Sequence, residues 1–579
     1  MREGEGVMKK VDPVTLEVVS NHLISIVREM AAALMRTSYS TIIREMGDYT
    51  TALFGAQAEL IAQAEHIPSH QGTLSEAAKT IFRTVEMEPE DVIIFNHPYE
   101  GGTHHPDIMI FKPVFADGEF VGMAGSLGHH IDVGGRSPGS ASTDALDVFE
   151  EGLMIPALKI VKAGVVNEDI FAMIRANIRV PHKTLGDIRA QMAAVALGER
   201  RLLELLAKYG RQRLAEITAG VIDNSERLMR EDLSAYQDGT YSAEGFMDGD
   251  GISDDPVRIF VTVTINGGDV TVDYTGSSPQ VKGPFNCAIT STYAATWCGV
   301  RYMVSPSIPQ NEGCYRPIKV IAPAGTIVRP IRPAPLSGRF HTLERMTNTI
   351  VKAFNQARGE NAVGACHSHL SSYAVSGTLA DSEDDHFVFF DLNGGGWGGT
   401  PVGDGLDATK GLMSNSRDCP IESLEMEYPL RMERYELLPD SGGPGKHRGG
   451  VGFYRVLRYL HGDGYFTNRS DGQKFAPEGV LGGNPGQTAR HKLIRADGTV
   501  IDMSSKVTNM DIHSGDLIHF ETVGGGGYGN PAERAPEKVL DDVLDGLVSA
   551  AQAREIYRVA VDVEKGVIDD ATTAALRAG

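Results

Sequence analysis

The feature that most constrains the fold of this chain is a predicted β-hairpin with polar clusters at its open end. Residues 108–115 and 119–127 are apolar, strand-like runs. Ala116-Asp117-Gly118 lies between them as a short turn that ends in glycine. We therefore expect the two runs to pair as antiparallel strands, which places everything just outside them at one end of a hairpin.

The open end of this hairpin gathers four imidazoles and two carboxylates. Centring the turn on Asp117 places Asp107 near Leu127 and His105 near His129. Directly opposed residues in such a pair lie ~5 Å apart and diagonal ones ~7–8 Å apart. Two clusters should therefore converge, namely Thr103-His104-His105-Pro106-Asp107 and His129-His130-Ile131-Asp132.

This convergence predicts a divalent-metal site. Histidine together with carboxylate suits Zn, Mn or Fe(II), and the sequence does not choose among them. The alternative interpretation is that these polar residues make only turn hydrogen bonds at the end of the hairpin. A single histidine would favour that alternative, whereas four histidines and two aspartates favour the metal.

The composition limits the possible partners and surroundings of the chain. Its net charge of −22 argues against binding nucleic acid or an anionic membrane surface. Five widely spaced cysteines without a CxxC motif fit a reducing cytoplasm. The charged N-terminus lacks a signal-peptide core, and no run of about 18 apolar residues predicts a membrane span. We expect a cytoplasmic protein.

At 579 residues the chain is long enough for several domains. The expected fold class is α+β, with a helical and hairpin-rich N-terminal part and a Gly-rich, β-dominated C-terminal part. Composition shifts near Gly239 and turns helical again after Asn530-Pro531. The predicted domains are a metal-site domain at 1–238, a β-rich domain with buried helices at 239–531, and a helical tail at 532–579.

Apolar periodicity predicts the individual elements. Helices are expected at residues 13–39, 72–85, 145–161, 168–178, 186–209, 214–236, 290–304, 342–357, 536–547 and 549–561. Strands are expected at 49–54 and 60–63, as β runs within 241–274, and as short strands with Gly-rich turns over 386–521. Asn266-Gly267 signals a hairpin in the second of these regions.

Other motifs carry less chemistry. Gly394, Gly396 and Gly399 have dinucleotide-loop spacing, but Thr400-Pro401 cannot open the helix that such a loop requires. We interpret this stretch, with Gly442–Gly450 and Gly524–Gly527, as Gly-rich turns. No nucleotide site is therefore expected in this chain.

Three further polar residues favour structural roles when judged by spacing alone. Asp48 follows Gly47 before a strand, which is ordinary for a turn residue. His66 and His70 are four apart, but Pro68 separates them and no Glu follows His66. That excludes the zinc-protease helix pattern.

Long ordered motifs resemble those of the hydantoinase B family over nearly the whole chain. They include VDPVTLEVV, GDYTTALF, AQAEHIPSHQG, PYEGGTHHPD, GHHIDVGG and YTGSSPQVKGPFN. This family is the metal-bearing subunit of ATP-dependent hydantoinases and caprolactamase-type lactamases. The chain is also similar to the C-terminal half of 5-oxoprolinase and, more distantly, to the large subunit of acetone and acetophenone carboxylases.

The resemblance implies a ligand set for one divalent metal, with Zn or Mn favoured. The family's ligands correspond to Asp48, His104, Asp107 and His129. One departure is His97, where the family usually has Asp before Pro-Tyr. It leaves open a changed substrate pocket or an additional ligand.

The resemblance also implies a mechanism shared between subunits. A hydantoinase A-like partner would phosphorylate the amide oxygen of a hydantoin, lactam or 5-oxoproline ring with ATP and Mg²⁺. This chain would then hydrolyse the activated ring at its metal. His130 or Asp132 is expected as general base or orienting residue, and Glu151 as a residue that contacts substrate. We expect a heterotetramer or larger complex.

Two alternatives remain open at this point. The chain could belong to an acetone- or acetophenone-type carboxylase, although it is shorter than the large subunits of those enzymes usually are. It could also be a scaffold subunit whose histidine cluster is structural.

Overall fold

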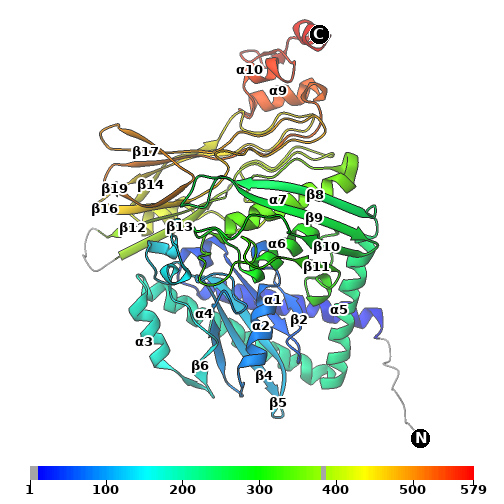
Figure 1. The fold of residues 1–579 in the computed structure, drawn as a ribbon, viewed down its shortest axis with the longest axis vertical. Helices are drawn as coiled ribbons and strands as arrows, with labels where there is room; N and C mark the ends of the chain where they lie inside the picture. The colour runs from blue at the N-terminus through cyan, green and yellow to red at the C-terminus, as the bar shows by residue number, and fades with distance from the viewer. Residues whose placement is uncertain (1–10, 65, 369, 380–385, 579) are drawn as a thin grey trace.

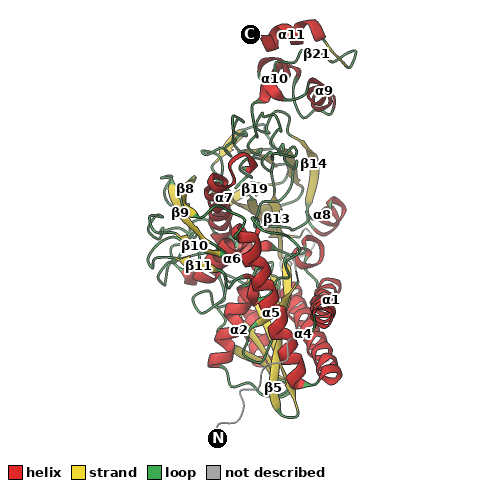
Figure 2. Ribbon diagram, turned by 90° about the vertical axis from the view of Figure 1, so that its right-hand side faces the viewer, coloured by secondary structure: helices red, strands yellow, loops and turns green. Residues whose placement is uncertain are grey.

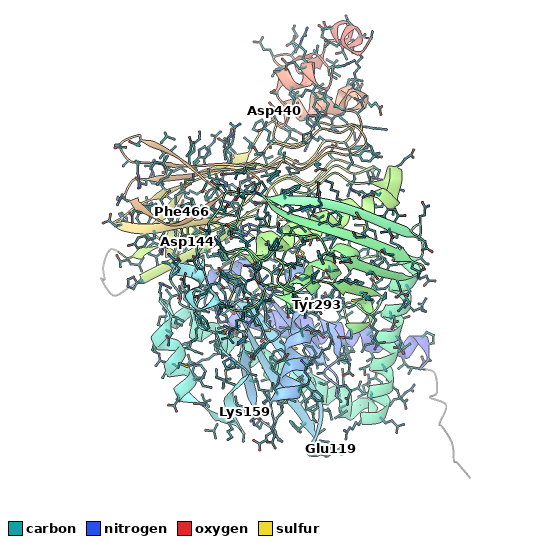
Figure 3. All side chains as sticks on the ribbon, viewed as in Figure 1. Glu119, Asp144, Lys159, Tyr293, Asp440 and Phe466 are labelled. Carbon is teal, nitrogen blue, oxygen red and sulfur yellow. The ribbon has the colours of Figure 1, made fainter. Side chains whose placement is uncertain are left out.

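A computed structural model describes residues 11–64, 66–368, 370–379 and 386–578 of the chain. It contains helices and several mostly antiparallel sheets, which confirms the expected α+β class. Figure 1 shows an elongated molecule, with the N-terminal helices and first sheet at one end and the C-terminal helices at the other. Figure 3 marks this length by Glu119, which follows the hairpin turn, and Asp440, which lies beside the tail.

The helices agree with the predicted periodicity in most places. Their bounds are α1 Pro13–Thr37, α2 Thr73–Thr84, α3 Glu168–Asn177, α4 Pro181–Tyr209, α5 Arg211–Leu233, α6 Ile289–Arg301, α7 Arg339–Arg358, α8 Ile421–Glu427, α9 Pro536–Leu544, α10 Ala550–Glu555 and α11 Asp570–Ala578. The short helices α8 and α11 were not expected. The predicted helix at 549–561 is shorter than expected, because the chain leaves α10 to form the two-residue strands β21 Val561–Asp562 and β22 Val567–Ile568.

The N-terminal sheet has seven strands in the order β2-β1-β5-β4-β3-β6-β7. The bounds are β1 Tyr49–Phe54, β2 Leu60–Gln63, β3 Val92–Phe95, β4 Asp107–Ala116, β5 Glu119–His129, β6 Leu158–Lys162 and β7 Val165–Val166. Helices α1 and α4 pack on one face and α2 on the other (Figure 2). Because both faces are covered, nearly every residue of β1, β4 and the end of β5 is buried.

The β4–β5 hairpin forms as predicted, but its register differs. Asp107 lies opposite His129, whereas the sequence placed it near Leu127. Asp117 and Gly118 both adopt positive φ, so the turn has two residues instead of three. A β-bulge next to Val114 adds a further residue. The combined shift of two residues keeps every side chain on its predicted face, so the polar clusters still meet.

The predicted helix at 145–161 is wrong. Residues Val148–Glu151 form one 3₁₀ turn, and the chain then enters β6, which pairs with β3. Gly152 has a φ of 131° and Pro156 follows it, so a helix cannot pass this point. Pairing of β6 with β3 overrides the helix propensity of this segment.

Beside the small β21-β22 sheet of the C-terminal tail, three further sheets follow in the described part of the chain. Their orders are β11-β10-β9-β8, β13-β12-β16-β19 and β14-β15-β20-β17-β18. Their bounds are β8 Gly239–Met247, β9 Val257–Asn266, β10 Asp269–Asp273, β11 Ile318–Ile321, β12 Ser371–Thr378, β13 His386–Asn393, β14 Leu430–Leu437, β15 Phe453–Tyr459, β16 Asp463–Arg469, β17 Arg490–Ile494, β18 Val500–Met503, β19 Lys506–His513 and β20 Leu517–Glu521. Asn266-Gly267 joins β9 to β10, as its hairpin signal predicted.

We call the part of the chain up to α5 the first unit and the part from β8 onward the second unit. Helix α7 of the second unit packs against β8 and β9 and also contacts the first unit. Its buried face includes Leu343, Met346 and Ile350, which share one core with strands of both units. The N-terminal end of α7 therefore reaches the open end of the β4–β5 hairpin.

The Gly-rich segments are closely packed extended chains and not the turns that we expected. Gly399 N–H donates to the Gly526 carbonyl over 2.8 Å, and Gly450 N–H to the Trp397 carbonyl over 2.8 Å. A Cβ on Gly398 would lie 1.8 Å from the Gly364 carbonyl oxygen. Neighbouring backbones thus come too close for any side chain, which explains the glycine content.

Helix α1 is the one helix among the described residues that is long and apolar enough to cross a bilayer by length and composition. Its apolar side packs instead on α4 and α5 through residues such as Leu23, Ile26 and Val27. This is the behaviour of a core helix.

The close packing of the glycine segments gives a testable contrast. We expect Gly398→Ala to lower the apparent melting temperature strongly, since overpacking costs ~1–3 kcal/mol or more. Gly403→Ala is the matched control, because its Cβ would meet nothing within 4 Å. Circular dichroism melts of both variants make the comparison. Equal melting temperatures would contradict the packing argument.

Candidate metal centre

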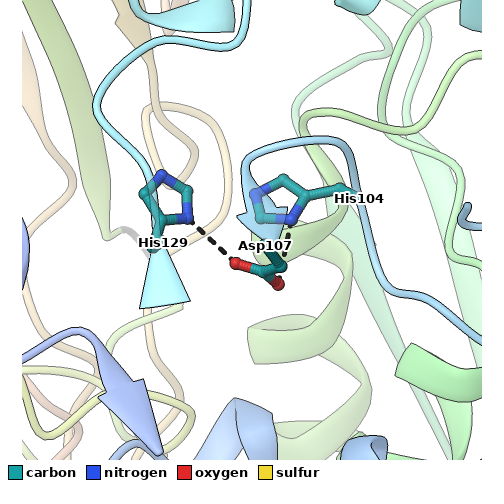
Figure 4. Close-up of side chains that lie close together, drawn as sticks. All are labelled: His104, Asp107 and His129. Atoms are coloured by element: carbon teal, nitrogen blue, oxygen red, sulfur yellow. Dashed lines mark hydrogen bonds and ion pairs between the residues drawn. The ribbon is translucent and has the colours of Figure 1, made fainter. Parts of the chain in front are cut away.

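Three potential ligands meet at the open end of the β4–β5 hairpin (Figure 4). His104 Nδ1 lies 3.0 Å from Asp107 Oδ2, and His129 Nδ1 lies 3.1 Å from Asp107 Oδ1. The three ligand atoms all fall within 4.8 Å of one another, and all three residues are buried. Asp107 and His129 start and end paired strands, so the ladder itself brings them together.

Asp107 is the centre of this cluster. Its Oδ2 also accepts hydrogen bonds from Thr103 Oγ1 and from Arg339 Nη2, each over 2.5 Å. Burial opposes ionisation of Asp107, but His104 and Arg339 lower its pKa well below its usual range. Burial and Arg339 lower the pKa of His104 well below its usual value. The cluster therefore presents an ionised carboxylate beside a neutral imidazole, the protonation states that metal binding requires.

Asp48 lies just before the neighbouring strand β1, beside the cluster, and is not one of the three residues whose ligand atoms converge. Its carbonyl accepts the His129 N–H over 3.0 Å, just before β1 pairs with β5. Its buried Oδ1 has no hydrogen-bond partner among the described residues. A buried, unsatisfied carboxylate oxygen is costly without a cation. This unsatisfied oxygen makes Asp48 a candidate for the fourth ligand that the resemblance predicts.

His70 also belongs to this region, although spacing alone did not select it. Its Nε2 lies 3.5 Å from Asp48 Oδ1 and 4.0 Å from Asp107 Oδ1. The 3₁₀ turn Pro68–His70 presents it, so the proline that ruled out a zinc-protease helix is part of what positions this ring. The available signal was its position within the family motif AQAEHIPSHQG.

His130 faces away from the ligands because side chains alternate along a strand. Its Nε2 lies 3.0 Å from Gln191 Oε1 on α4, and Gln191 in turn donates to the Ile108 carbonyl. The structure does not bring this imidazole into the cluster with His129.

Asp132 is likewise engaged elsewhere. Its carboxylate accepts backbone hydrogen bonds from Gly134, Gly139 and Arg179, and one from the Arg179 guanidinium over 3.0 Å. All these donors shape the loop after β5. This geometry suits a residue that positions the loop, and it leaves little capacity for accepting a substrate proton.

Glu151 lies on a second polar face next to the cluster. Its carboxylate accepts the N–H groups of Leu336 and Ser337 over 2.7–3.0 Å. His105 Nδ1 lies 3.8 Å from Glu151 Oε2. Burial raises the pKa of Glu151 to about 7, against the effect of those hydrogen bonds. An acid with such a pKa can exchange protons near neutral pH.

His97 does not join the three-residue group that could hold a metal. Its Nε2 lies 3.8 Å from Glu100 Oε1, and its Nδ1 accepts the Tyr99 N–H. His70, which lies 4.0 Å from Asp107 Oδ1, is therefore closer to these ligand atoms than His97, for which no contact with them is found among the described residues.

The second unit completes the site. Arg339 is the first residue of α7, and the Phe390 ring of β13 lies 5.5 Å from the His129 ring. Both are more than 200 positions away from the hairpin in the sequence. The centre therefore lies at a junction between segments that the chain brings together only in the folded state.

Metal binding by this cluster can be checked with one matched pair of variants. We expect His129→Ala to lose the divalent ion, because it removes one of three converging ligands. His130→Ala should retain it, because that ring faces α4. Elemental analysis of both purified variants measures the difference. Full metal content in His129→Ala would refute the assignment.

The raised pKa of Glu151 predicts a pH-dependent stability. Unfolded glutamate titrates near 4.5, so between that pH and about 7 the folded chain keeps a proton that the unfolded chain has lost. This contribution is complete below 4.5 and is lost as the pH rises through 7. It amounts to at most about 3 kcal/mol.

Glu151→Gln removes this titration and serves as the comparison. Between pH 5 and pH 8, the melting temperature of the wild type should fall more than that of Glu151→Gln. Parallel pH profiles of the two proteins would mean that Glu151 titrates normally.

Comparison with known proteins identifies the family of this chain. The Hydantoinase B/oxoprolinase family profile matches residues 12–531. The B component of a putative D-/L-hydantoinase from Pseudomonas sp. (strain NS671) is 38% identical over 96% of each chain. The crystal structure of an ATP-dependent caprolactamase from Pseudomonas jessenii superposes with a TM-score of 0.89 at 31% identity, covering 99% of this chain and 100% of that one.

A more distant structure shares the fold alone. A nucleotide-free acetone carboxylase, from work on ATP-dependent acetone carboxylation, gives a TM-score of 0.91 at 22% identity and covers 98% of this chain and 82% of that one. The family profile covers most of the chain, and full-length relatives exceed 30% identity. This chain therefore belongs to the hydantoinase B/oxoprolinase family.

Proposed function

We propose that this chain is the metal-bearing subunit of an ATP-dependent hydrolase that opens a cyclic amide, such as a hydantoin, a lactam or a 5-oxoproline-like ring. The observation that carries the proposal is the buried cluster of His104, Asp107 and His129 in a chain of this family. Relatives named as single subunits of a hydantoinase and of a caprolactamase support the substrate class and the presence of a partner.

The chemistry explains why ATP is needed. Resonance makes an unstrained amide carbonyl a poor electrophile. A partner subunit resembling hydantoinase A would transfer the γ-phosphoryl group of ATP, with Mg²⁺, to the amide oxygen. The resulting imidate-like phosphate is far more open to attack by water. This chain would receive that activated ring.

The residues of the metal centre have different proposed roles. Asp48, His104, Asp107 and His129 would hold the ion, with His70 beside them. A divalent ion bound there supplies Lewis acidity and makes water a better nucleophile near neutral pH. His130, through Gln191, and Asp132, through its loop contacts, keep the hairpin end in shape.

Glu151 is the group we assign to proton transfer. Its pKa of about 7 lets it take a proton from attacking water or deliver one to the leaving ring nitrogen. His105, 3.8 Å away, has both ring nitrogens buried and without a hydrogen-bond partner among the described residues. This pair lies next to the ligand cluster because His105 and His104 are consecutive.

The proposal makes the chain dependent on its partner. Its Gly-rich segments are occupied by backbone packing, so nothing among them resembles a phosphate-binding loop. The two subunits must also shelter a labile phosphorylated ring, for which we expect a lasting heterotetramer or larger complex. Stable complexes of this kind often bury more than ~2,000 Å².

Reconstitution tests this dependence. The purified chain alone, the ATP-binding partner alone and their mixture are each assayed for ring opening and for ATP loss. Only the mixture should open the ring with stoichiometric ATP use. Ring opening by this chain alone, without ATP, would replace the coupled mechanism with that of an independent metallohydrolase.

Two other functions are decided by related assays. The likeness in fold to acetone carboxylase keeps carboxylation as the second candidate, and incorporation of labelled bicarbonate into product would favour it. Full activity of a metal-stripped complex would instead indicate a scaffold role for this chain.

A further inference from the structure

The first residue of α7 is a buried arginine that is only partly satisfied. Arg339 is 2% exposed, and its Nη2 contacts both Asp107 and His104. Its Nε and Nη1 have no hydrogen-bond partner among the described residues. Leaving charged donors unpaired in a buried site costs several kcal/mol, so a ligand oxygen is expected there.

A second buried arginine lies close by. Arg469 is 4% exposed, and its Nη1 donates to the Ser337 carbonyl over 2.9 Å. Its Nε has no partner, and within the described part of the chain no carboxylate lies within ion-pair distance of it. Burial lowers the pKa of Arg469 to about 10; the charge of Glu151 opposes this shift, and the charge of Arg339 adds to it.

The loop between these arginines adds neutral donors. Ser337 is buried, and its N–H donates to Glu151. Its Oγ makes no hydrogen bond of normal geometry among the described residues, although it lies close enough to Glu151 to lower the pKa of that acid. Ser337 lies two residues before α7, a helix of 20 residues. The N-terminal end of such a helix carries a partial positive charge. Two guanidinium groups, a hydroxyl and a helix N-terminus together are the usual components of a phosphate site.

The charge balance also calls for an anion. Arg339 compensates Asp107, whereas Arg469 has no carboxylate of its own within the described residues. Glu151, the acid whose charge acts on Arg469, has a pKa raised to about 7 and is therefore only partly ionised near neutral pH. A divalent ion on Asp48 and Asp107 would make the pocket still more positive. Buried charges of one sign are not left in excess without a compensating ligand.

We propose that Arg339, Arg469 and Ser337 form a binding site for a phosphoryl group beside the metal cluster. The group would be the one carried by the activated substrate, or the inorganic phosphate that it becomes. This inference rests on the proposed function, which supplies a phosphorylated ring to this chain. Because Arg339 contacts Asp107, a phosphoryl group held there would place the ring carbon attached to it beside the metal-binding cluster.

The test is phosphate binding by the metal-stripped full-length chain, measured by calorimetry with inorganic phosphate. Arg469→Gln should weaken binding by about 10- to 100-fold, the loss of one charged hydrogen bond. Ser337→Ala should weaken it by about 2- to 10-fold, and it disturbs folding least. Arg345→Gln on the same helix is the matched control, since Arg345 already pairs with Asp471.

Melting temperatures show whether each variant is folded. If Arg469→Gln is unfolded, the phosphate affinity of Ser337→Ala decides the test. Competition by phenyl phosphate would identify a substrate-borne group, and its absence would identify free phosphate as the ligand. No saturable phosphate binding by the wild type, or unchanged binding in folded Arg469→Gln and Ser337→Ala, would overturn the proposal. An inactive reconstituted complex would not affect this readout, so the two failures are distinguishable.

Discussion

The buried charge of Asp107 is the interaction on which the rest of the centre depends. The carboxylate is fully buried, is paired with Arg339, accepts a hydrogen bond from Thr103, and contacts His104 and His129. Removing one partner of a buried ion pair typically costs ~3–5 kcal/mol, because the remaining charge is left without compensation. Arg339 begins α7, so this ion pair ties the second unit to the end of the first sheet. The contact between Arg339 and Asp107 therefore fixes both the position of the ligands and the packing of the two units.

Strand alternation explains which polar residues face the ligands. His129 and His130 are neighbours, yet one contacts Asp107 and the other contacts Gln191 on α4. The sequence predicts this hairpin because apolar runs and a turn signal are local features. It misplaces the register by two residues, because the turn is one residue shorter than expected and a bulge near Val114 adds one more. An error of two conserves the faces, whereas an error of one would have exchanged the two histidines.

What could not be predicted depends on contacts between distant segments. Arg339 is 235 positions from His104, and nothing in its local sequence indicates that it meets a metal cluster. Glu151 was expected as a substrate contact, but the helix expected around it was wrong, and its bonds to Leu336 and Ser337 follow from the fold. The glycine segments show the same limit. Glycine is required both in tight turns and where two backbones approach closely. The sequence of one segment does not show which of the two applies, because the difference depends on the segment that packs against it.

The arrangement of charges follows the origin of the segments. The hairpin and its neighbouring strand supply carboxylates and imidazoles, which are donors for a cation. The segment from Ser337 to Arg339, together with Arg469, supplies positive groups, which are donors for an anion. Neither set is stable when buried alone, because each would carry uncompensated charge. Packing the two units together places the sets side by side, so each lowers the cost of burying the other. A centre of this kind is complete only when both units are docked, and anything that loosens α7 should weaken the binding of the cation as well as that of the anion.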